Sequence, residues 1–462
     1  MKLTTTKLGF HFYSVFGVVF IVASVVGKTD SIADSDSAPK PNEANQDVKP
    51  YVEILSDAHA WKRLPKLLTG EEQPLPNWAK AVATQLPRTA AAMLELDAVH
   101  RTQSPLDPAL RAKLRWMIAH ANRCQYSEAY AIADLRRSGA MEAEVEQLVG
   151  DRAHWRDEDR DALNFVQIMT TSAPSLPDSL FSSVKDRFGD RGVAAMILLA
   201  AYGNFQDRII LGLNLPLENG GPLSPLAIKF VDGALQRSPL LPPTNGSATY
   251  LDDGKSVVPR DDAWNAISYD QLQTQLEQQR LRQPRLPIPE WNDVKSNLPA
   301  EMAARPTKIR WSLMNYGYAH ELAIPWTIAT RTHWAECPTE RILEESLFWI
   351  QTRAIGCNYC MGHCEMLLEV AGLEPSAVSK RTRMLAETDW AAFPIAEQRA
   401  YAFARKLTRS PWELTAVDYH SLETEFGKQK AMSIFWWLCR GLYMTRVSDG
   451  FQLPLERENV FE

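Results

Sequence analysis

Apolar residues recur at helical spacing through nearly all of the chain after Tyr51. In one clear example, Leu343, Leu347, Ile350 and Ala354 place apolar side chains on one face of a segment whose other face is polar. Alternating runs flanked by two-residue hairpin turns are few, so a core built on β-sheet is not expected. The pattern therefore predicts an all-α protein.

The N-terminal segment has a different pattern. Lys2 and Lys7 precede an apolar stretch from Val15 to Val26. A positively charged start followed by such a stretch is typical of a secretory signal. Counted from Phe10, the stretch nearly reaches the length that spans a bilayer, so a membrane anchor stays open as well. We therefore expect export to the periplasm or another extracytoplasmic space, with residues 1–27 either cleaved as a signal peptide or kept as an anchor.

Composition divides the rest of the chain into two helical regions and their connections. Residues 28–50 lack aromatic and most β-branched side chains and predict a disordered linker. Residues 219–288 are rich in Pro, Gly and Asn and predict a long connection with one short solvated helix over Gln271–Arg282. The first region, 51–218, and the second region, 289–462, are the predicted domains.

Three motifs recur in the same order in the two regions. The separation is 233 residues at the first motif and 238 at the later two. Conserved order over roughly 100 residues indicates a tandem repeat rather than chance, so two homologous helical domains are expected. The matched segments are Cys124-Gln-Tyr-Ser127 with Cys357-Asn-Tyr-Cys360, Arg187-Phe-Gly189 with Glu425-Phe-Gly427, and Leu213-Asn-Leu-Pro-Leu-Glu218 with Phe451-Gln-Leu-Pro-Leu-Glu456.

The second copy has a Cys-x-x-Cys pair at a predicted helix start. Gly356 can end the preceding helix in a left-handed conformation, and a new helix is predicted from Cys357 to Ala371. Cys357 and Cys360 are then one turn apart, which is close enough for a disulfide. The positive helix end is expected to lower the thiol pKa and favour a thiolate. Six cysteines are too few for a disulfide scaffold, so the pair points to redox chemistry.

These residues resemble the alkylhydroperoxidase D and carboxymuconolactone decarboxylase superfamily of small all-helical domains. The redox-active branch has a Glu, eleven residues, Cys-x-x-Cys, three residues and a His. Those positions are filled here by Glu345, Cys357, Cys360 and Cys364. The histidine stands one residue earlier, at His363. The flanking Ala-Ile-Gly-Cys-Asn-Tyr-Cys-Met-Gly-His and the closing Leu-Pro-Leu-Glu segments are also similar to the family, and the resemblance covers residues 75–218 and 310–456.

The resemblance implies a thiol peroxidase. It implies that Cys360 attacks a hydroperoxide, that Cys357 closes a redox-active disulfide, and that Glu345 is the base. His363, displaced by one position, would take part in the proton relay. Cys364 would be either a third redox thiol or an inert buried one. The resemblance further implies an external dithiol or thioredoxin-like reductant, a homo-oligomer and no cofactor.

The first copy has lost this set of residues. Cys124 is kept, but Ser127 replaces the second cysteine, Tyr130 stands at the position of His363, and Ala112 stands at that of Glu345. Because a serine cannot form the disulfide, this copy is predicted to support the fold or an interface.

Other interpretations stay open. The chain could be a lactone decarboxylase, as in the other branch of the superfamily, although that branch does not depend on a cysteine pair. It could be a non-catalytic binding or structural protein. A metal site is geometrically strained on a single helix, and none is expected; its ligands would be Cys357, Cys360, His363 and Cys364. Judged by charge alone, Glu344 could replace Glu345 as the base, and only the spacing of the resembled family selects Glu345. Nucleic acid is not an expected partner, because the net charge is −6 and basic runs are short.

Overall fold

The computed structural model describes residues 49–150, 155–231, 262–387 and 390–461. The predicted signal segment, 1–27, lies outside these ranges, as does all but the end of the predicted linker, 28–50. A search of the described helices finds none that combines the length and the apolar character needed to cross a bilayer.

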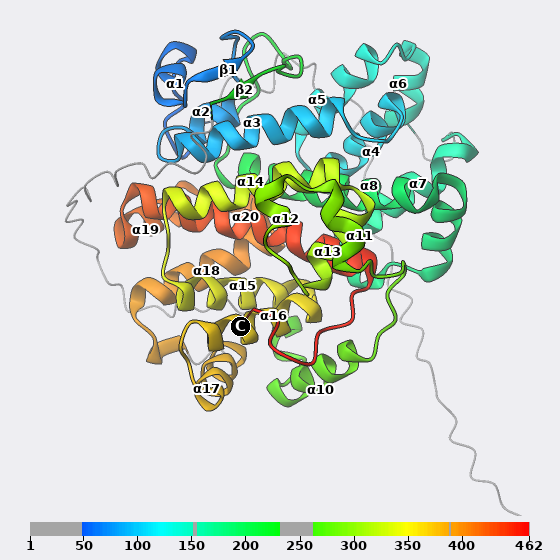
Figure 1. The fold of residues 1–462 in the computed structure, drawn as a ribbon. Coiled ribbons are helices and arrows are strands. Elements are labelled where there is room, and N and C mark those ends of the chain that lie inside the picture. The colour runs from blue at the N-terminus through cyan, green and yellow to red at the C-terminus, as the bar shows by residue number, and fades with distance from the viewer. Residues whose placement is uncertain (1–48, 151–154, 232–261, 388–389, 462) are drawn as a thin grey trace, which may run out of the picture. The chain divides into compact units, whose positions relative to one another are not determined.

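The described chain is built mainly of helices, which confirms the all-α prediction. Within these ranges the only sheet is a two-stranded antiparallel ribbon of β1 (Leu67–Thr69) and β2 (Lys229–Phe230), in which Leu67 lies opposite Phe230 (Figure 1). β2 belongs to the predicted connection between the regions. The start of that connection is therefore paired with the first region.

The start of α4 in the first region is fixed by a capping residue and a proline. Asp107 accepts hydrogen bonds from the backbone N–H groups of Ala109 and Leu110 at 2.9 and 3.0 Å, and Pro108 takes the first position of α4. The helices are α1 (Asp57–Arg63), α2 (Asn77–Val82), α3 (Pro87–Thr102), α4 (Pro108–Ala121), α5 (Gln125–Arg137), α6 (Glu142–Val149), α7 (Asp157–Ser172) and α8 (Asp178–Gly212).

Helices of the second region follow in a similar order. Gly356 ends α15 with a φ of +87°, and the next helix starts directly after Cys357, close to the predicted boundary. The helices are α11 (Trp291–Val294), α12 (Ala300–Ala303), α13 (Arg310–Tyr318), α14 (His320–Glu336), α15 (Arg341–Ile355), α16 (Asn358–Val370), α17 (Pro375–Ala386), α18 (Ile395–Arg409), α19 (Ala416–Phe426) and α20 (Lys428–Phe451).

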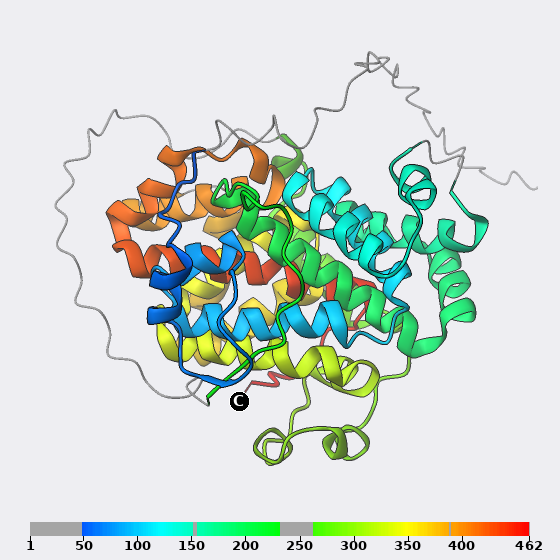
Figure 2. The ribbon, with the colours of Figure 1, turned by 90° about the horizontal axis from the view of Figure 1, so that it is seen from above.

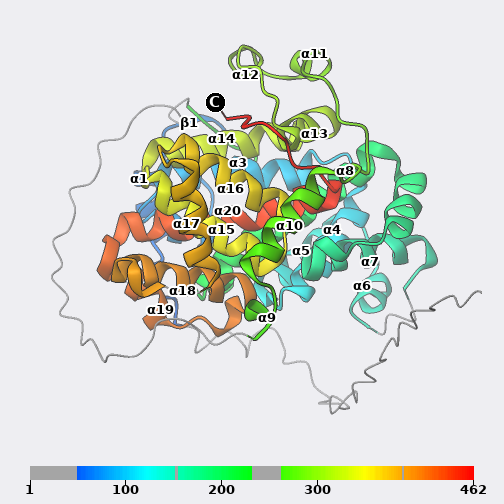
Figure 3. The ribbon, with the colours of Figure 1, turned by 90° about the horizontal axis from the view of Figure 1, so that it is seen from below.

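The connection contains the expected helix, but this helix is not solvated on all sides. α10 (Tyr269–Arg280) follows the short α9 (Asp262–Asn265) and begins with a capping box on Ser268. Leu272 and Leu276, one turn apart, are buried where α10 packs on α16 (Figure 3). The apolar pair gives the helix one buried face, so the connection covers the predicted thiol helix.

Backbone conformation repeats along the two regions with the spacing of the sequence motifs. Most residues with positive φ form pairs separated by 233 or 238 positions; they lie at or just after the ends of helices, except Gly189, which interrupts α8. Because a left-handed residue costs about 1 kcal/mol when it carries a side chain, such positions mark the same required turns in both regions. The pairs are Arg123 and Gly356, Gly139 and Gly372, Gly189 and Gly427, and Asn214 and Gln452.

The two regions share one hydrophobic core. α8 packs along α20, and α3 packs along α14 (Figures 1 and 2). Phe205 on α8 meets Trp436 on α20 edge to face, with ring centroids 5.5 Å apart, and meets Trp326 on α14 in the same way at 5.1 Å. The predicted domains 51–218 and 289–462 therefore lie within one compact unit.

A buried carboxylate also joins the regions. Glu336, the last residue of α14, accepts hydrogen bonds from the backbone N–H groups of Arg88 and Thr89 at 2.9 and 2.7 Å, and from the Thr89 hydroxyl at 2.6 Å. These N–H groups belong to the first turn of α3, which has no intrahelical partners for them. An acidic side chain from the second region thus caps a helix of the first region.

We expect Glu336→Ala to lower the free energy of unfolding by about 2–4 kcal/mol, because it leaves two N–H groups of α3 buried without acceptors. Urea unfolding followed by circular dichroism measures the change. Glu413→Ala, which removes an exposed carboxylate, is the matched control and should shift stability by less than about 0.5 kcal/mol. Equal small effects of both substitutions would contradict this role for Glu336.

Candidate thiol site and its counterpart in the first region

A cavity of about 390 Å³ lies beside the start of α16. Its wall is largely aromatic and apolar, with residues Trp311, Trp326, Trp334, Phe348, Trp437, Met444 and Phe461. Its acidic, basic and thiol side chains come from four helices and are Arg331, Arg341, Glu345, Cys360, His363 and Arg440. Three of the residues selected from the sequence, Glu345, Cys360 and His363, therefore face one cavity.

The two thiols of the Cys-x-x-Cys pair lie against each other. Cys357 occupies the N-cap of α16 and is fully buried outside the cavity wall, whereas Cys360 lines the cavity. The thiols are within hydrogen-bonding contact, and Cys360 Sγ lies 3.1 Å from the Ser448 hydroxyl on α20. All six cysteines are free. The second thiol of the pair is thus the one that a molecule in the cavity would meet.

Burial, rather than the charge of the helix end, is the largest influence on the pKa of the Cys357 thiol. Desolvation raises its pKa well above the ordinary value, and the neighbouring Cys360 and Asp449 raise it further. The predicted lowering of the thiol pKa is therefore wrong for Cys357. The partial positive charge at a helix end stabilises a thiolate by less free energy than it costs to ionise a thiol that water cannot reach.

Asp449 is a site residue that sequence reasoning missed. Its carboxyl group is fully buried on α20 and contacts the Cys357 thiol. Burial raises its pKa to about 7, although the contact with Cys357 and the charge of Arg446 oppose the rise. The available signal was an acidic residue in a helix that is largely apolar from Ala431 onward, because such a residue is buried only where it has a partner.

Glu345 is buried on α15 and faces the cavity. Burial raises its pKa to about 7 against the opposing charges of Arg341 and Arg440, and Arg341 Nε lies 3.1 Å from Glu345 Oε1. The neighbouring Glu344 also has its pKa raised to about 7, but it does not line the cavity. The cavity thus favours Glu345 over Glu344, as the family spacing did.

His363 pairs with Glu456, whereas the expected proton relay would place it with Glu345. Its Nε2 lies 2.8 Å from Glu456 Oε2, and the Tyr359 hydroxyl donates to Glu456 Oε1 at 3.0 Å. Burial opposes ionisation of Glu456, but the hydrogen bond and charge of His363 hold its pKa below the usual value. Among the described residues Glu345 is contacted instead by Cys364, which occupies the position of the family histidine. The one-residue displacement therefore directs the imidazole away from Glu345.

Arg440 is the second residue that sequence reasoning missed. Burial lowers its pKa to about 10, and its guanidinium stacks on Trp437 at 4.1 Å from the ring centroid. The charge of this group acts on both Glu345 and Cys360. A thiolate formed on Cys360 would therefore lie near a buried cation.

The first region has an equivalent framework around a smaller cavity. Glu218 accepts hydrogen bonds from the hydroxyls of Tyr126 and Tyr130 at 2.5 and 2.9 Å, as Glu456 does from Tyr359 and His363. Ala112, Ser127 and Tyr130 line a cavity of about 40 Å³. Cys124 donates to the Ser127 hydroxyl at 3.4 Å. Cys124 and Ser127 thus lie at the positions matched to Cys357 and Cys360, and a serine cannot form a disulfide.

Comparison of the sequence with known proteins does not assign the chain to a family. No family model matches the chain, and no curated protein is significantly similar to it. Within the described ranges no group of three or more His, Cys, Asp or Glu side chains is arranged to hold a metal ion. The chemistry of the thiol site is therefore inferred from its own residues and geometry.

We expect Glu345→Gln to change the pH dependence of stability. Glu345 keeps its proton up to about pH 7 in the folded state but loses it near pH 4.5 when unfolded, so its contribution to stability is present below pH 4.5 and is lost as the pH rises to 7. Glutamine does not titrate. The stability of the variant relative to the wild type should therefore rise by about 2 kcal/mol between pH 5 and pH 8.

Urea unfolding at the two pH values measures this difference. Glu301→Gln, at an exposed position on α12, is the control and should show no such trend. A difference between Glu345→Gln and wild type that stays constant with pH would contradict the raised pKa of Glu345.

Proposed function

We propose that the protein is a thiol-dependent reductase of organic hydroperoxides that uses Cys360 and Cys357. The observation that carries the proposal is the position of Cys360, which lies in the wall of a large cavity and in contact with a second thiol. The resemblance of the surrounding motif to the redox-active branch of the alkylhydroperoxidase superfamily supports the same chemistry.

In the first step the Cys360 thiolate attacks the outer oxygen of the hydroperoxide. The O–O bond breaks, the sulfur becomes a sulfenic acid, and the alkoxide that leaves takes up a proton to become an alcohol. Glu345 has a pKa near 7 and faces the same cavity, so it can receive the proton of the Cys360 thiol and return it to the alkoxide. Arg440 lines the same cavity, and its charge interacts with Cys360.

In the second step Cys357 attacks the sulfur of the sulfenic acid. A disulfide forms, and hydroxide leaves as water after taking the thiol proton. Asp449 contacts Cys357 and has a pKa of about 7, so it can accept that proton and pass it on. An external dithiol then reduces the disulfide and becomes oxidised itself, which returns both cysteines to thiols.

The cavity favours an organic substrate over hydrogen peroxide. A volume of about 390 Å³ is far more than a molecule the size of water or hydrogen peroxide occupies. Aromatic side chains make up much of the wall, and such walls bind apolar groups. Arg331 lines the same cavity and can pair with an acidic group of the substrate.

We also propose that the chain consists of two copies of one alkylhydroperoxidase-like domain, of which the second is active. The repeated turn residues and the matched carboxylates, Glu218 and Glu456, support this duplication. Since α8 and α20 pack together, the two copies would supply within one chain the contact that related proteins make between subunits.

We expect the reduced full-length chain to form a Cys357–Cys360 disulfide when it is mixed with cumene hydroperoxide. Disulfide mapping by mass spectrometry measures the bridge. Cys360→Ser should abolish peroxide consumption, and Cys357→Ser should accumulate a sulfenic acid on Cys360 that dimedone traps, because no second thiol closes the bridge.

Cys364→Ser tests whether the third thiol takes part, and Cys439→Ser, which removes another buried thiol, is its matched control. The proposal fails if no bridge depends on peroxide. A Cys357→Ser/Cys360→Ser double variant that keeps full activity on a lactone would instead favour the decarboxylase branch. A Cys360 that reacts with a thiol reagent no faster than an ordinary cysteine would favour a non-catalytic protein.

We expect Asp449→Asn to slow disulfide closure more than the attack on peroxide, because it removes the proton acceptor of the resolving thiol. Stopped-flow measurement should find closure about 10-fold or more slower, with sulfenic acid persisting on Cys360. Peroxide consumption in the first turnover should change by less than about 3-fold by the same argument. Equal slowing of both steps would contradict a role confined to Cys357.

A further inference from the structure

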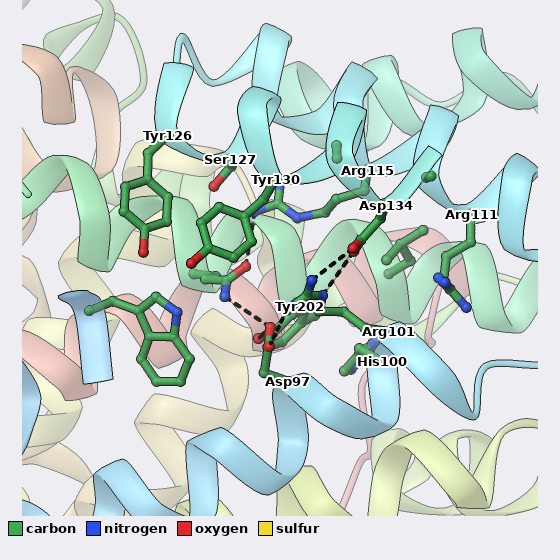
Figure 4. Close-up of a pocket in the computed structure, with 15 residues that line it drawn as sticks. Asp97, His100, Arg101, Arg111, Arg115, Tyr126, Ser127, Tyr130, Asp134 and Tyr202 are labelled. Carbon is green, nitrogen blue, oxygen red and sulfur yellow. Dashed lines mark hydrogen bonds and ion pairs between the residues drawn. The ribbon is translucent and has the colours of Figure 1, made fainter. Parts of the chain in front are cut away.

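The cavity of the first region contains polar groups that the proposed thiol chemistry does not use. It lies among α3, α4, α5 and α8 and has a volume of about 40 Å³ (Figure 4). A single water requires about 10–15 Å³ of such a cavity, so this one has room for a few waters or one small molecule.

Most charges around this cavity are paired. Arg101 donates to both carboxylate oxygens of Asp134, at 2.7 and 2.8 Å (Figure 4). The Tyr202 hydroxyl donates to Asp97 at 2.7 Å. Arg115 forms an ion pair with the buried Asp207. These carboxylates are therefore already engaged with donors.

Arg111 is the exception. Its side chain lines the cavity from α4 and is largely buried, and it makes no hydrogen bond or ion pair with any residue that the structure describes. Asp134 and Asp107 act on it only through their more distant charges, and burial lowers its pKa. A largely desolvated cation on a cavity wall is stabilised when an anion pairs with it, so Arg111 marks the cavity as a place where an anion can bind.

His100 supplies a second unused group. Its side chain is 1% exposed, lines the same cavity and stacks on Tyr202 with ring centroids 4.2 Å apart. Neither ring nitrogen has a hydrogen-bond partner in the structure. Burial and the charges of Arg111 and Arg115 lower its pKa to about 3. The ring is therefore neutral and offers one N–H donor.

We propose that this cavity binds a small oxyanion, either a short carboxylate or an inorganic anion such as bicarbonate or nitrate. The guanidinium of Arg111 balances its charge, and the N–H of His100 donates to one of its oxygens. An apolar molecule would leave both groups without partners, and a cation would meet the unpaired Arg111. The volume limits the ligand to a few non-hydrogen atoms.

Isothermal titration and thermal unfolding of the full-length chain test the site. The probes are formate, acetate, bicarbonate and nitrate, each compared with sodium chloride at equal ionic strength. We expect saturable binding of at least one probe at one site, together with a rise in the melting temperature. Arg111→Gln should weaken binding at least 10-fold, and His100→Phe, which keeps the ring stacked on Tyr202, should also weaken it.

Arg136→Gln is the matched control. It removes one positive charge from the same region at an exposed ion pair with Glu142, so binding should be unchanged. If Arg111→Gln folds poorly, Arg111→Lys keeps the charge but loses the planar fork and should still weaken binding. The proposal is overturned if no probe binds saturably, or if Arg111→Gln and Arg136→Gln lower the affinity equally.

Discussion

The mutual burial of α8 and α20 is the constraint on which the rest of the structure depends. From Val193 to Gly212 and from Ala431 to Phe451, nearly every side chain of the two helices is buried. A helix that is buried on nearly all sides must be covered by other elements, and here part of that cover comes from the other region. Burying each large apolar side chain contributes about 1.5–3 kcal/mol, and many such side chains meet here. The two regions are therefore parts of one core.

This core also explains the electrostatics of the thiol site. Asp449 and Arg446 lie on α20 and must be buried with it, beside Cys357. Glu345 is buried in the same way on α15. In each case burial is the largest influence on the acid, and the nearby arginine charges only partly offset it. Two carboxyl groups with pKa values near 7 result, and groups of that kind can both accept and donate a proton at neutral pH.

The two cavities have one framework and different contents. In each region a carboxylate from the closing Leu-Pro-Leu-Glu segment binds two side chains one turn apart on the helix that follows the matched cysteine, Cys124 or Cys357. The first cavity has a volume of about 40 Å³ and the second about 390 Å³, and different side chains line them. At matched positions Arg101, Asp134 and Tyr202 of the first region correspond to Trp334, Leu367 and Arg440 of the second.

The sequence alone determined features that depend on neighbouring residues. Helical spacing predicted the all-α class, and Gly356 together with the following cysteines predicted the start of α16, because caps and periodicity are local. Tertiary structure decided which groups surround the thiols. Asp449 and Arg440 come from a helix some 80–90 residues later, and Glu456 takes His363 away from Glu345. Burial also raised the pKa of Cys357, since solvent access is set by the packing of distant segments, and no local pattern records it.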